Sequence, residues 1–358
     1  MTNFPGIQPA TKLESDKKRL YIGAYGFEDR SVGWLEFQKE KSSILDHAFM
    51  IKYQNPKGKN RIEESKKALS KICKARPIDI VYNVSSPYQI EDLIVEKIGK
   101  FFSSVDEIVL DISAMTKLLI LAALFQLKDY KGDLRIIYCE AEESAPEEEK
   151  YRRDISDMQK MTSFPSSGVE SIIRLRCLSS IRMQGQPVTM IAFTSFNEQL
   201  VRHMLGTISP HRLIFINGHP TREDYAWREN AMQEIHKRMI AEYPSDNRLN
   251  ARGLLERTAG TLDYRDTINR ISEIYNEYGM YERIICAATG SKMQTVGLFF
   301  AKIKYPDIHV EYPTPDSYFE EVYSKGIRSV NEIFIPKFSD FIRNIEQLQL
   351  SSGIGSSS

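Results

Sequence analysis

Two lysines occupy corresponding positions in two similar stretches of this 358-residue chain. In "DISAMTKLLILAALFQLK", residues 111–128, Thr116 and Lys117 come directly before an apolar run, and in "AATGSKMQTV", residues 287–296, Ser291 and Lys292 do the same. A hydroxyl and an ammonium in the first turn of a helix, beside its unpaired amides, form a compact site for a phosphate or another anion. The sequence therefore predicts two anion sites.

A simpler interpretation competes with this one. A Ser or Thr before a helix is commonly a cap, and a lysine beside it is commonly solvated. Capping does not require lysine, however, and the helix dipole disfavours a cation at this end. The occurrence of the same pair at both points favours a bound anion that offsets this cost.

The elements around the first pair alternate between strands and helices. Apolar, β-rich segments at 19–26, 44–53, 78–84, 105–113 and 134–142 predict strands, and the segments between them, 28–40, 61–74, 85–102 and the run after Lys117, have helical spacing. Ser86 before Pro87 suits the start of the third helix. Strands separated by helices in this way predict βαβ units and a mainly parallel, doubly wound sheet.

The second half repeats this order. The segments at 187–196, 211–223 and 251–275 match the first three strands with their surroundings, and 282–313 follows the fourth and fifth closely. Lys117 and Lys292 are 292 − 117 = 175 residues apart. We therefore predict an α/β fold of two Rossmann-like, doubly wound units in tandem, related by an internal pseudo-twofold repeat. The expected division is an N-terminal arm (1–18), unit 1 (19–145), a linker (146–186), unit 2 (187–331), and a C-terminal helix with a disordered tail (332–358).

Ligands of parallel sheets bind beyond the carboxyl ends of the strands. The polar and aromatic residues expected there in the first half are Tyr25, Gly26, Glu28, Asp29, Arg30, Gln54, Asn55, Ser85, Ser86, Asp111, Ser113, Thr116 and Lys117. In the second half they are Phe193, Thr194, Ser195, Asn197, Asn217, His219, Arg222, Arg257, Thr258, Thr289, Gly290, Ser291 and Lys292.

Several of these residues have two interpretations. Asp111 either contacts the ligand or forms an ion pair with Lys117 or Arg30. His219 is either a ligand contact or general base, or a satisfied turn histidine. For Glu28, an acidic residue at a solvated helix start is favoured over a catalytic role.

Composition excludes several classes of function. Lys+Arg and Asp+Glu both number 48, so no global positive field attracts duplex DNA or an anionic membrane. The six histidines and four cysteines lack metal-ligand spacing, and no P-loop, GxGxxG, GxSxG or HExxH motif occurs. No metal or cofactor is expected. The scattered cysteines and the absence of a signal peptide or long apolar run indicate a soluble, cytoplasmic protein.

The segments "LDISAMTKLL" and "AATGSKMQTV" resemble the signature of CARF domains, Rossmann-like sensors of CRISPR-associated and related anti-phage systems. That family carries a motif like D-x-[TS]-G-G-T-K-x-M after its fourth core strand and binds cyclic oligonucleotides with it and with the loop after the first strand. The first copy replaces the paired glycines with Ala114-Met115, and the second has Cys286 in place of the acidic residue. Two such units in one chain resemble the SAVED domain of CBASS-like systems.

The resemblance implies a sensor that binds a cyclic oligonucleotide, or another nucleotide, between its two halves and signals to an effector protein or another copy of the chain. Lys117 and Lys292 would neutralise phosphates, Thr116 and Ser291 would donate hydrogen bonds, and Tyr25 or Phe193 would stack on bases. A metal-independent ring nuclease that cleaves the messenger, and a structural adaptor of a defence complex, are the alternatives.

Overall fold

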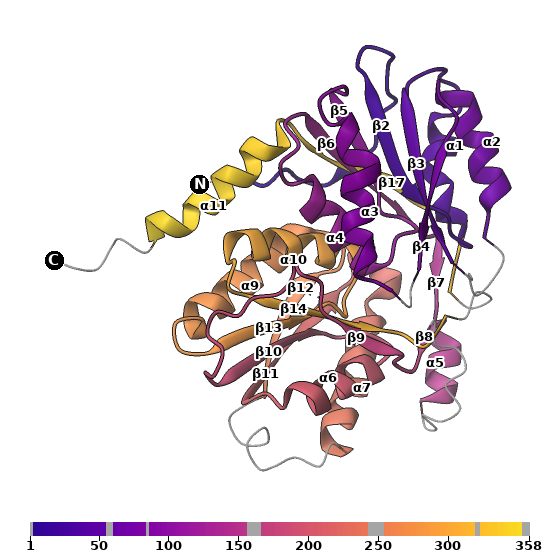
Figure 1. Cartoon of the computed structure of the whole chain (residues 1–358). Helices are drawn as coiled ribbons and strands as arrows, with labels where there is room; N and C mark the ends of the chain where they lie inside the picture. Colours follow the sequence, from indigo (N-terminus) through magenta and orange to yellow (C-terminus); the bar gives the residue numbers. More distant parts are fainter. Residues whose placement is uncertain are drawn as a thin grey trace. The chain divides into compact units, whose positions relative to one another are not determined.

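The computed structural model describes residues 3–54, 60–83, 86–155, 166–242, 254–318 and 323–352. The chain divides into two compact units (Figure 1). Unit 1 comprises Met1–Ala145 together with Glu320–Leu348, and unit 2 contains Pro146–Phe319.

Unit 1 is built on a seven-stranded sheet in the order β1-β17-β6-β5-β2-β3-β4. Five strands are mutually parallel, whereas β17 is antiparallel to β6 and β1 is antiparallel to β17. The strands are β1 (Gln8–Pro9), β2 (Arg19–Ala24), β3 (His47–Tyr53), β4 (Ile78–Tyr82), β5 (Glu107–Asp111), β6 (Asp133–Glu140) and β17 (Ser329–Ile335).

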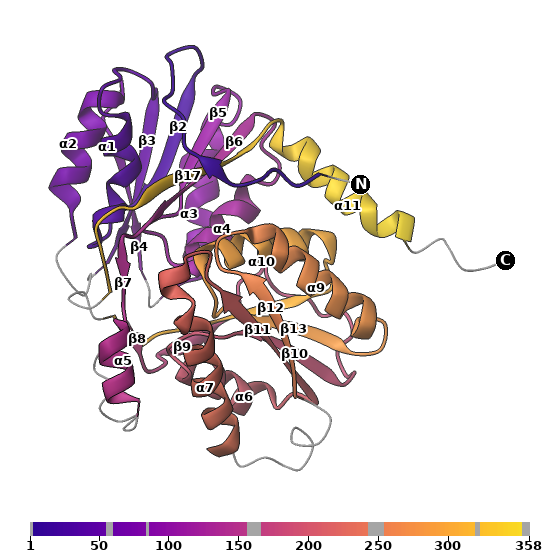
Figure 2. The same cartoon turned by 180° about the vertical axis from the view of Figure 1, so that it is seen from behind.

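Helices cover both faces of this sheet (Figure 2). One pair is α1 (Gly33–Gln38), which follows η1 (Asp29–Ser31), and α2 (Ile62–Ile72); the other is α3 (Gln89–Ile98), which continues into η2 (Gly99–Phe101), and α4 (Lys117–Leu127). In α2, Ser65, Ala68, Leu69 and Ile72 form the buried stripe that helical spacing predicts. Short β7 (Glu143–Ser144) and β16 (Ser324–Lys325) pair with each other, and α11 (Phe338–Ser352) follows β17.

Unit 2 is built on a six-stranded sheet in the order β12-β11-β10-β13-β14-β9, parallel except for β9. Its strands are β9 (Ser171–Ile173), β10 (Val188–Phe193), β11 (Arg212–His219), β12 (Leu254–Gly260), β13 (Arg283–Ala287) and β14 (His309–Thr314). Its helices are α5 (Glu148–Asp154), α6 (Gln199–Ile208), η4 (Glu223–Tyr225), α7 (Trp227–Glu242), α9 (Tyr264–Tyr278) and α10 (Lys292–Lys304), and β8 (Ser166–Ser167) pairs with β15 (Ser317–Tyr318).

The two parallel cores have the same topology. Numbered along the chain within each unit, the parallel strands lie in the order 5-4-1-2-3 both in β6-β5-β2-β3-β4 and in β14-β13-β10-β11-β12. The predicted α/β class with two Rossmann-like, parallel-dominated sheets is therefore confirmed.

The predicted division of the chain differs from the observed one at three places. β1, in the predicted arm, and β17, in and after the predicted end of unit 2, both belong to the unit 1 sheet. The predicted linker contributes α5, β8 and β9 to unit 2. Ser351 and Ser352, assigned to a disordered tail, end α11.

The start of α3 also differs from the prediction. The helix begins at Gln89 after Tyr88, whose side chain makes no capping hydrogen bond. Ser86 instead belongs to a turn in which its N–H donates to the Asn83 carbonyl at 3.0 Å and its carbonyl accepts from Gln89 at 3.2 Å. Pro87 therefore lies in the turn before the helix rather than in its first position.

A buried ionic network joins the strands of unit 1 near their amino ends. Glu107 on β5 accepts from Arg19 of β2 at 3.0 Å and from Arg135 of β6 at 2.6 Å. Arg135 also pairs with Glu332 of β17 at 2.7 Å, and Glu332 accepts from the Thr11 N–H. Glu107 and Glu332 are 0% and 1% exposed, so the network ties the C-terminal strand to the parallel core in the interior of the unit.

Glu332→Ala tests how this strand is held. Removing one partner of a buried ion pair leaves Arg135 partly uncompensated, and we expect a loss of roughly 3 to 5 kcal/mol in the free energy of unfolding. Chemical denaturation of the full chain measures it. Glu346→Ala, on the exposed side of α11, is the control and should change stability by less than about 0.5 kcal/mol. Equal stability of the two variants would contradict the structural role of the network.

Candidate functional site

In unit 1 the carboxyl ends of the first and fourth parallel strands, β2 and β5, approach closely. A Cβ atom placed on Gly26 would lie 2.9 Å from the Cβ of Ala114, so only glycine fits at this point. The Tyr53 hydroxyl, at the end of β3, donates to the Ala114 carbonyl at 3.2 Å and accepts from the Thr116 N–H at 3.0 Å. Three strand ends therefore meet at the start of α4.

Thr116 is the N-cap of α4, as the sequence predicts. Its side chain accepts from the Leu119 N–H at 3.3 Å. Tyr53 is the neighbour that sequence analysis missed, because an aromatic residue ending a strand has no motif that distinguishes it from core. Burial raises the pKa of Tyr53, and hydrogen bonds from Thr116 oppose the rise, so the hydroxyl stays protonated beside the helix start.

Lys117 is the first residue of α4 and is half-buried. Desolvation lowers the pKa of its ammonium from 10.5 to about 8. The positive end of the helix dipole also disfavours a cation at this position. An anionic ligand oxygen at the helix start would offset both costs.

Asp111 and Ser113 point into the protein rather than toward a ligand. Asp111, 3% exposed, accepts from the Tyr21 hydroxyl at 3.0 Å and from the Ser113 N–H at 2.9 Å. The Ser113 hydroxyl is fully buried and accepts from the N–H of Cys139 on β6 at 2.9 Å. These two residues hold the loop after β5 in shape.

Tyr25, Arg30 and Glu28 are interior as well. Tyr25 is 0% exposed and its hydroxyl donates to Asp79 at 2.8 Å, so its ring has no face on which a base could stack. The Arg30 guanidinium donates to both carboxylate oxygens of Glu28, at 2.7 and 3.0 Å. Burial by itself would lower the pKa of Arg30, but the pairing with Glu28 outweighs it, so the pKa is raised. The prediction of a solvated helix start at Glu28 is wrong, because its carboxylate is buried in this pair.

In unit 2 the carboxyl ends of the first and fourth strands, β10 and β13, also approach closely. The Thr289 hydroxyl donates to the Phe193 carbonyl at 2.6 Å and accepts from the Phe193 N–H at 3.0 Å. A Cβ on Gly290 would lie 2.8 Å from that of Phe193. Phe193 and Thr289 are each 1% exposed, so they form the base of the site, and the proposed stacking role of Phe193 is not supported.

Ser291 caps α10 through a capping box. Its hydroxyl accepts from the Gln294 N–H at 3.0 Å, while the Gln294 side chain accepts from the Ser291 N–H at 2.8 Å. The same hydroxyl donates to the Thr261 carbonyl at 2.7 Å, so its proton is already used inside the unit. Lys292 follows as the first helical residue and is half-buried, as Lys117 is in unit 1.

Four other predicted residues of unit 2 lie at or just after the ends of β10 and β11. Thr194 is 4% exposed and accepts from the Gly218 N–H, and the half-buried Ser195 donates to the Asn197 carbonyl at 3.2 Å. His219 lies at the end of β11 with its Nδ1 2.6 Å from Glu229, which agrees with a satisfied turn histidine. Asn217 donates to Glu256.

The structure therefore separates an accessible rim from a buried base at each strand junction. The half-buried rim consists of Gly26, Thr116 and Lys117 in unit 1, and Ser195, Gly290, Ser291 and Lys292 in unit 2. Arg222 and Arg257 pair with Asp224 and Glu277, away from these rims. Asn55 and Ser85 lie outside the described residues.

Within the described residues, no group of three or more His, Cys, Asp or Glu side chains is arranged to hold a metal ion. In the same part of the chain no helix has both the length and the apolar content that crossing a bilayer requires. Cys286, which replaces the acidic residue of unit 1, is fully buried, and burial raises the pKa of its thiol to about 12.

No protein-family model and no curated protein matches the sequence. Solved structures resemble it at low identity. A universal stress protein of Pseudomonas aeruginosa UCBPP-PA14 is 8% identical, with 94% of this chain and 99% of that chain covered and a TM-score of 0.26. A type III CRISPR defence DNA nuclease activated by cyclic oligoadenylate is 8% identical, with 79% of this chain and 64% of that chain covered and a TM-score of 0.44.

Can2 of Sulfobacillus thermosulfidooxidans, in complex with cyclic tetra-adenylate, is 11% identical, with 82% of this chain and 95% of that chain covered and a TM-score of 0.24. These values are too low to transfer a function to this chain.

The lowered pKa of Lys117 predicts how stability changes when its charge is removed. Below pH 8 the ammonium is charged in both folded and unfolded chains, and the folded protein bears the desolvation cost. Lys117→Met should therefore raise the free energy of unfolding at pH 7 by roughly 1 kcal/mol, or the melting temperature by about 2 to 4 °C. Between pH 8 and 10.5 the unfolded wild type binds more protons than the folded one, so its stability rises and the advantage of the variant shrinks.

Lys302 is the matched control. Desolvation lowers its pKa to about 8 too, and its ammonium donates to the Pro306 and Ile308 carbonyls, at 2.6 Å each. Lys302→Met leaves these carbonyls without their donor and should destabilise the protein. Thermal unfolding across this pH range compares the two, and a lower melting temperature for Lys117→Met at pH 7 would contradict the account.

Proposed function

We propose that this chain is a sensor that binds a cyclic oligonucleotide second messenger at the rims after its first and fourth parallel strands and signals to a partner protein in anti-phage defence. The observation that carries the proposal is the repetition of one arrangement in both units. A hydroxyl caps a buried helix and a lysine is its first residue, in Thr116-Lys117 and in Ser291-Lys292. A glycine lies where the two strand ends approach, but it is Gly26 after the first strand in unit 1 and Gly290 after the fourth strand in unit 2.

The chemistry of this arrangement suits a phosphate diester. The cap side chains satisfy the N–H groups of Leu119 and Gln294, and the first amides of α4 and α10 point toward the rims. A phosphate there would accept from these amides and stabilise the lysine ammonium. Because a cyclic oligonucleotide carries several phosphodiesters, it has a negatively charged group for more than one such helix start.

The refined roles differ from those expected from the sequence. Ser291 already donates its proton to Thr261, so in unit 2 the lysine and the helix amides supply the ligand contacts. In unit 1, Tyr53 positions the loop that carries Thr116 and Lys117. The CARF-like resemblance of the two segments and the cyclic oligoadenylate named for two similar structures make cyclic oligoadenylates the first ligands to test.

Isothermal titration calorimetry of the full chain with cyclic di-, tri- and tetra-adenylate tests the proposal. We expect micromolar or tighter binding of at least one compound, and a loss of about tenfold or more for Lys117→Ala and for Lys292→Ala. Lys66→Ala, an exposed lysine on α2, is the matched control and should bind like wild type.

The same titration reports the ligand-to-chain ratio, which tests the sequence-based prediction that one ligand uses both sites. Chromatography of the ligand afterwards distinguishes a sensor, which returns it intact, from a ring nuclease. Absence of binding to all three compounds, or affinities that neither lysine substitution changes, would refute the sensor.

A further inference from the structure

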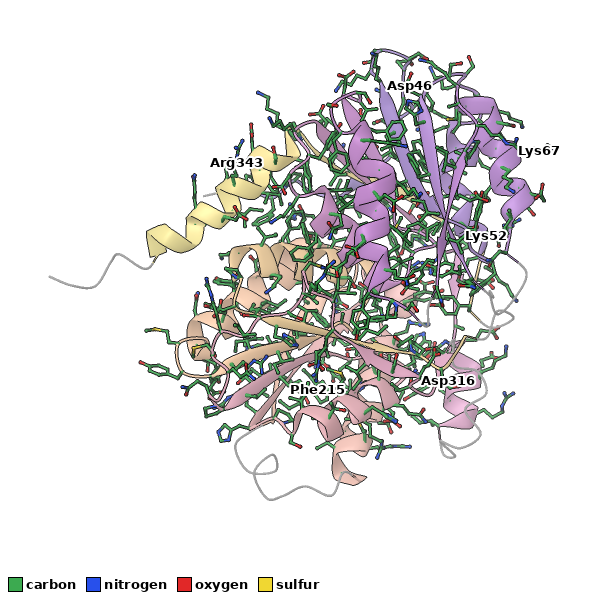
Figure 3. The ribbon with its side chains drawn as sticks, in the orientation of Figure 1. Asp46, Lys52, Lys67, Phe215, Asp316 and Arg343 are labelled. Carbon is green, nitrogen blue, oxygen red and sulfur yellow. The ribbon has the colours of Figure 1, made fainter. Side chains whose placement is uncertain are left out.

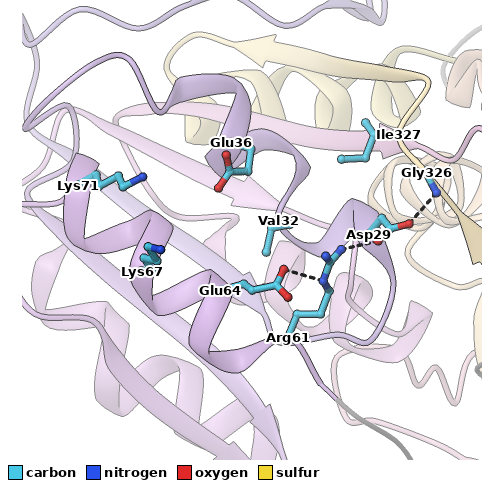
Figure 4. Close-up of a pocket in the computed structure, with 9 residues that line it drawn as sticks. All are labelled: Asp29, Val32, Glu36, Arg61, Glu64, Lys67, Lys71, Gly326 and Ile327. Atoms are coloured by element: carbon cyan, nitrogen blue, oxygen red, sulfur yellow. Dashed lines mark hydrogen bonds and ion pairs between the residues drawn. The ribbon is translucent and has the colours of Figure 1, made fainter.

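Unit 1 has a second recess, separate from the strand junction described above. It is a cavity of about 520 Å³ lined by η1, α1, α2 and the residues between β16 and β17 (Figure 4). Its lining residues are Asp29, Val32, Glu36, Arg61, Glu64, Lys67, Lys71, Gly326 and Ile327.

One wall of this cavity is a closed set of polar contacts. Asp29 accepts from the Arg61 guanidinium and, at 2.7 Å, from the Gly326 N–H. Arg61 also pairs with Glu64 at 2.8 Å. Because these groups hydrogen-bond to one another, this wall has a fixed conformation but presents little uncompensated charge to a ligand.

The opposite wall, on α2, offers positive charge, and apolar side chains also line the cavity. Lys67 and Lys71 lie one turn apart on α2 and are exposed, and within the described residues neither has an ion-pair partner (Figures 3 and 4). Ile327, which follows Gly326 and lies across the cavity from these lysines, is 38% exposed, and Val32 also lines the cavity (Figure 4). Two ammonium groups in a cavity with apolar side chains complement a chain that carries two carboxylates and one bulky apolar side chain.

The cavity is connected to the candidate messenger rim by direct hydrogen bonds. The Arg61 N–H donates to the Gly26 carbonyl at 2.9 Å, and Gly26 is part of that rim. Glu28, two residues after Gly26, accepts from Ser324 on β16, two residues before the Gly326 whose N–H donates to Asp29. These hydrogen bonds join Gly26 and its neighbours to residues on two sides of the cavity.

We propose that this cavity is the docking site for an acidic linear segment of a partner protein, with carboxylates on Lys67 and Lys71 and an apolar side chain on Val32 and Ile327. Docking of the partner segment does not require the messenger. Coupling between docking and messenger binding through Gly26 rests on the proposed function and is tested separately.

Selection of displayed random short peptides on the full chain tests the docking site. We expect enriched sequences with at least two acidic residues and one bulky apolar residue. A synthetic peptide of that sequence should lose about tenfold or more in affinity, by fluorescence polarisation, on Lys67→Glu/Lys71→Glu and on Ile327→Ser. Lys66→Glu/Lys100→Glu reverses two exposed charges elsewhere on unit 1 and should leave the affinity unchanged.

Failure to enrich any peptide over the Lys67→Glu/Lys71→Glu chain overturns docking, and so does equal binding of a peptide whose carboxylates are replaced by amides. If the chain self-associates and the double variant abolishes this, the occupant is a second copy and the partner assignment is wrong. With docking established, cyclic tetra-adenylate should change the peptide affinity by about fivefold or more. If the messenger is shown to bind and the peptide affinity does not change, the coupling is overturned but the docking site is not.

Discussion

The order of the parallel strands is the constraint on which both candidate sites depend. In each unit the first strand lies between the second and the fourth, and the connections after the first and fourth strands leave on opposite faces of the sheet. The chain must therefore open a crevice beyond these two strand ends. Gly26 against Ala114, and Gly290 against Phe193, show how closely the backbones approach there.

The two ends of the sheets use charge in different ways. At the amino ends, opposite charges satisfy one another in Arg19–Glu107–Arg135 of unit 1, and Glu282 joins Thr189 and Arg212 in unit 2. At the carboxyl ends a lysine begins each buried helix, at the positive end of the helix dipole, and desolvation lowers the pKa of Lys117. The helix dipole by itself disfavours a cation at this position.

Much of the architecture was predictable because periodicity and repetition are local signals. The parallel strands, the amphipathic α2 and the equivalence of Lys117 and Lys292 follow from apolar spacing and from one repeated motif. The addition of β1 and β17, from opposite ends of the chain, to the unit 1 sheet was not predictable. Their place in the sheet depends on tertiary pairing, such as that of Glu332 with Arg135, rather than on a local sequence pattern.

At the sites, residue type and position after a strand predict candidate residues but not which way their side chains point. Asp111, Ser113 and Thr289 follow strands as ligand residues do, yet each turns inward to hold its loop. Tyr53 was missed because its role depends on a hydroxyl that reaches the loop of a strand two places away in the sheet.

The most direct test of the central claim is the titration of Lys117 itself. Heteronuclear NMR of the lysine side-chain carbons, assigned with Lys117→Arg, measures the pKa of this ammonium with and without saturating cyclic tetra-adenylate. We predict a pKa of about 8 for Lys117 in the free protein and an increase in this pKa of roughly one or more when a phosphate lies beside the ammonium. An identical titration curve in the ligand-bound protein would contradict the claim that this lysine holds the messenger.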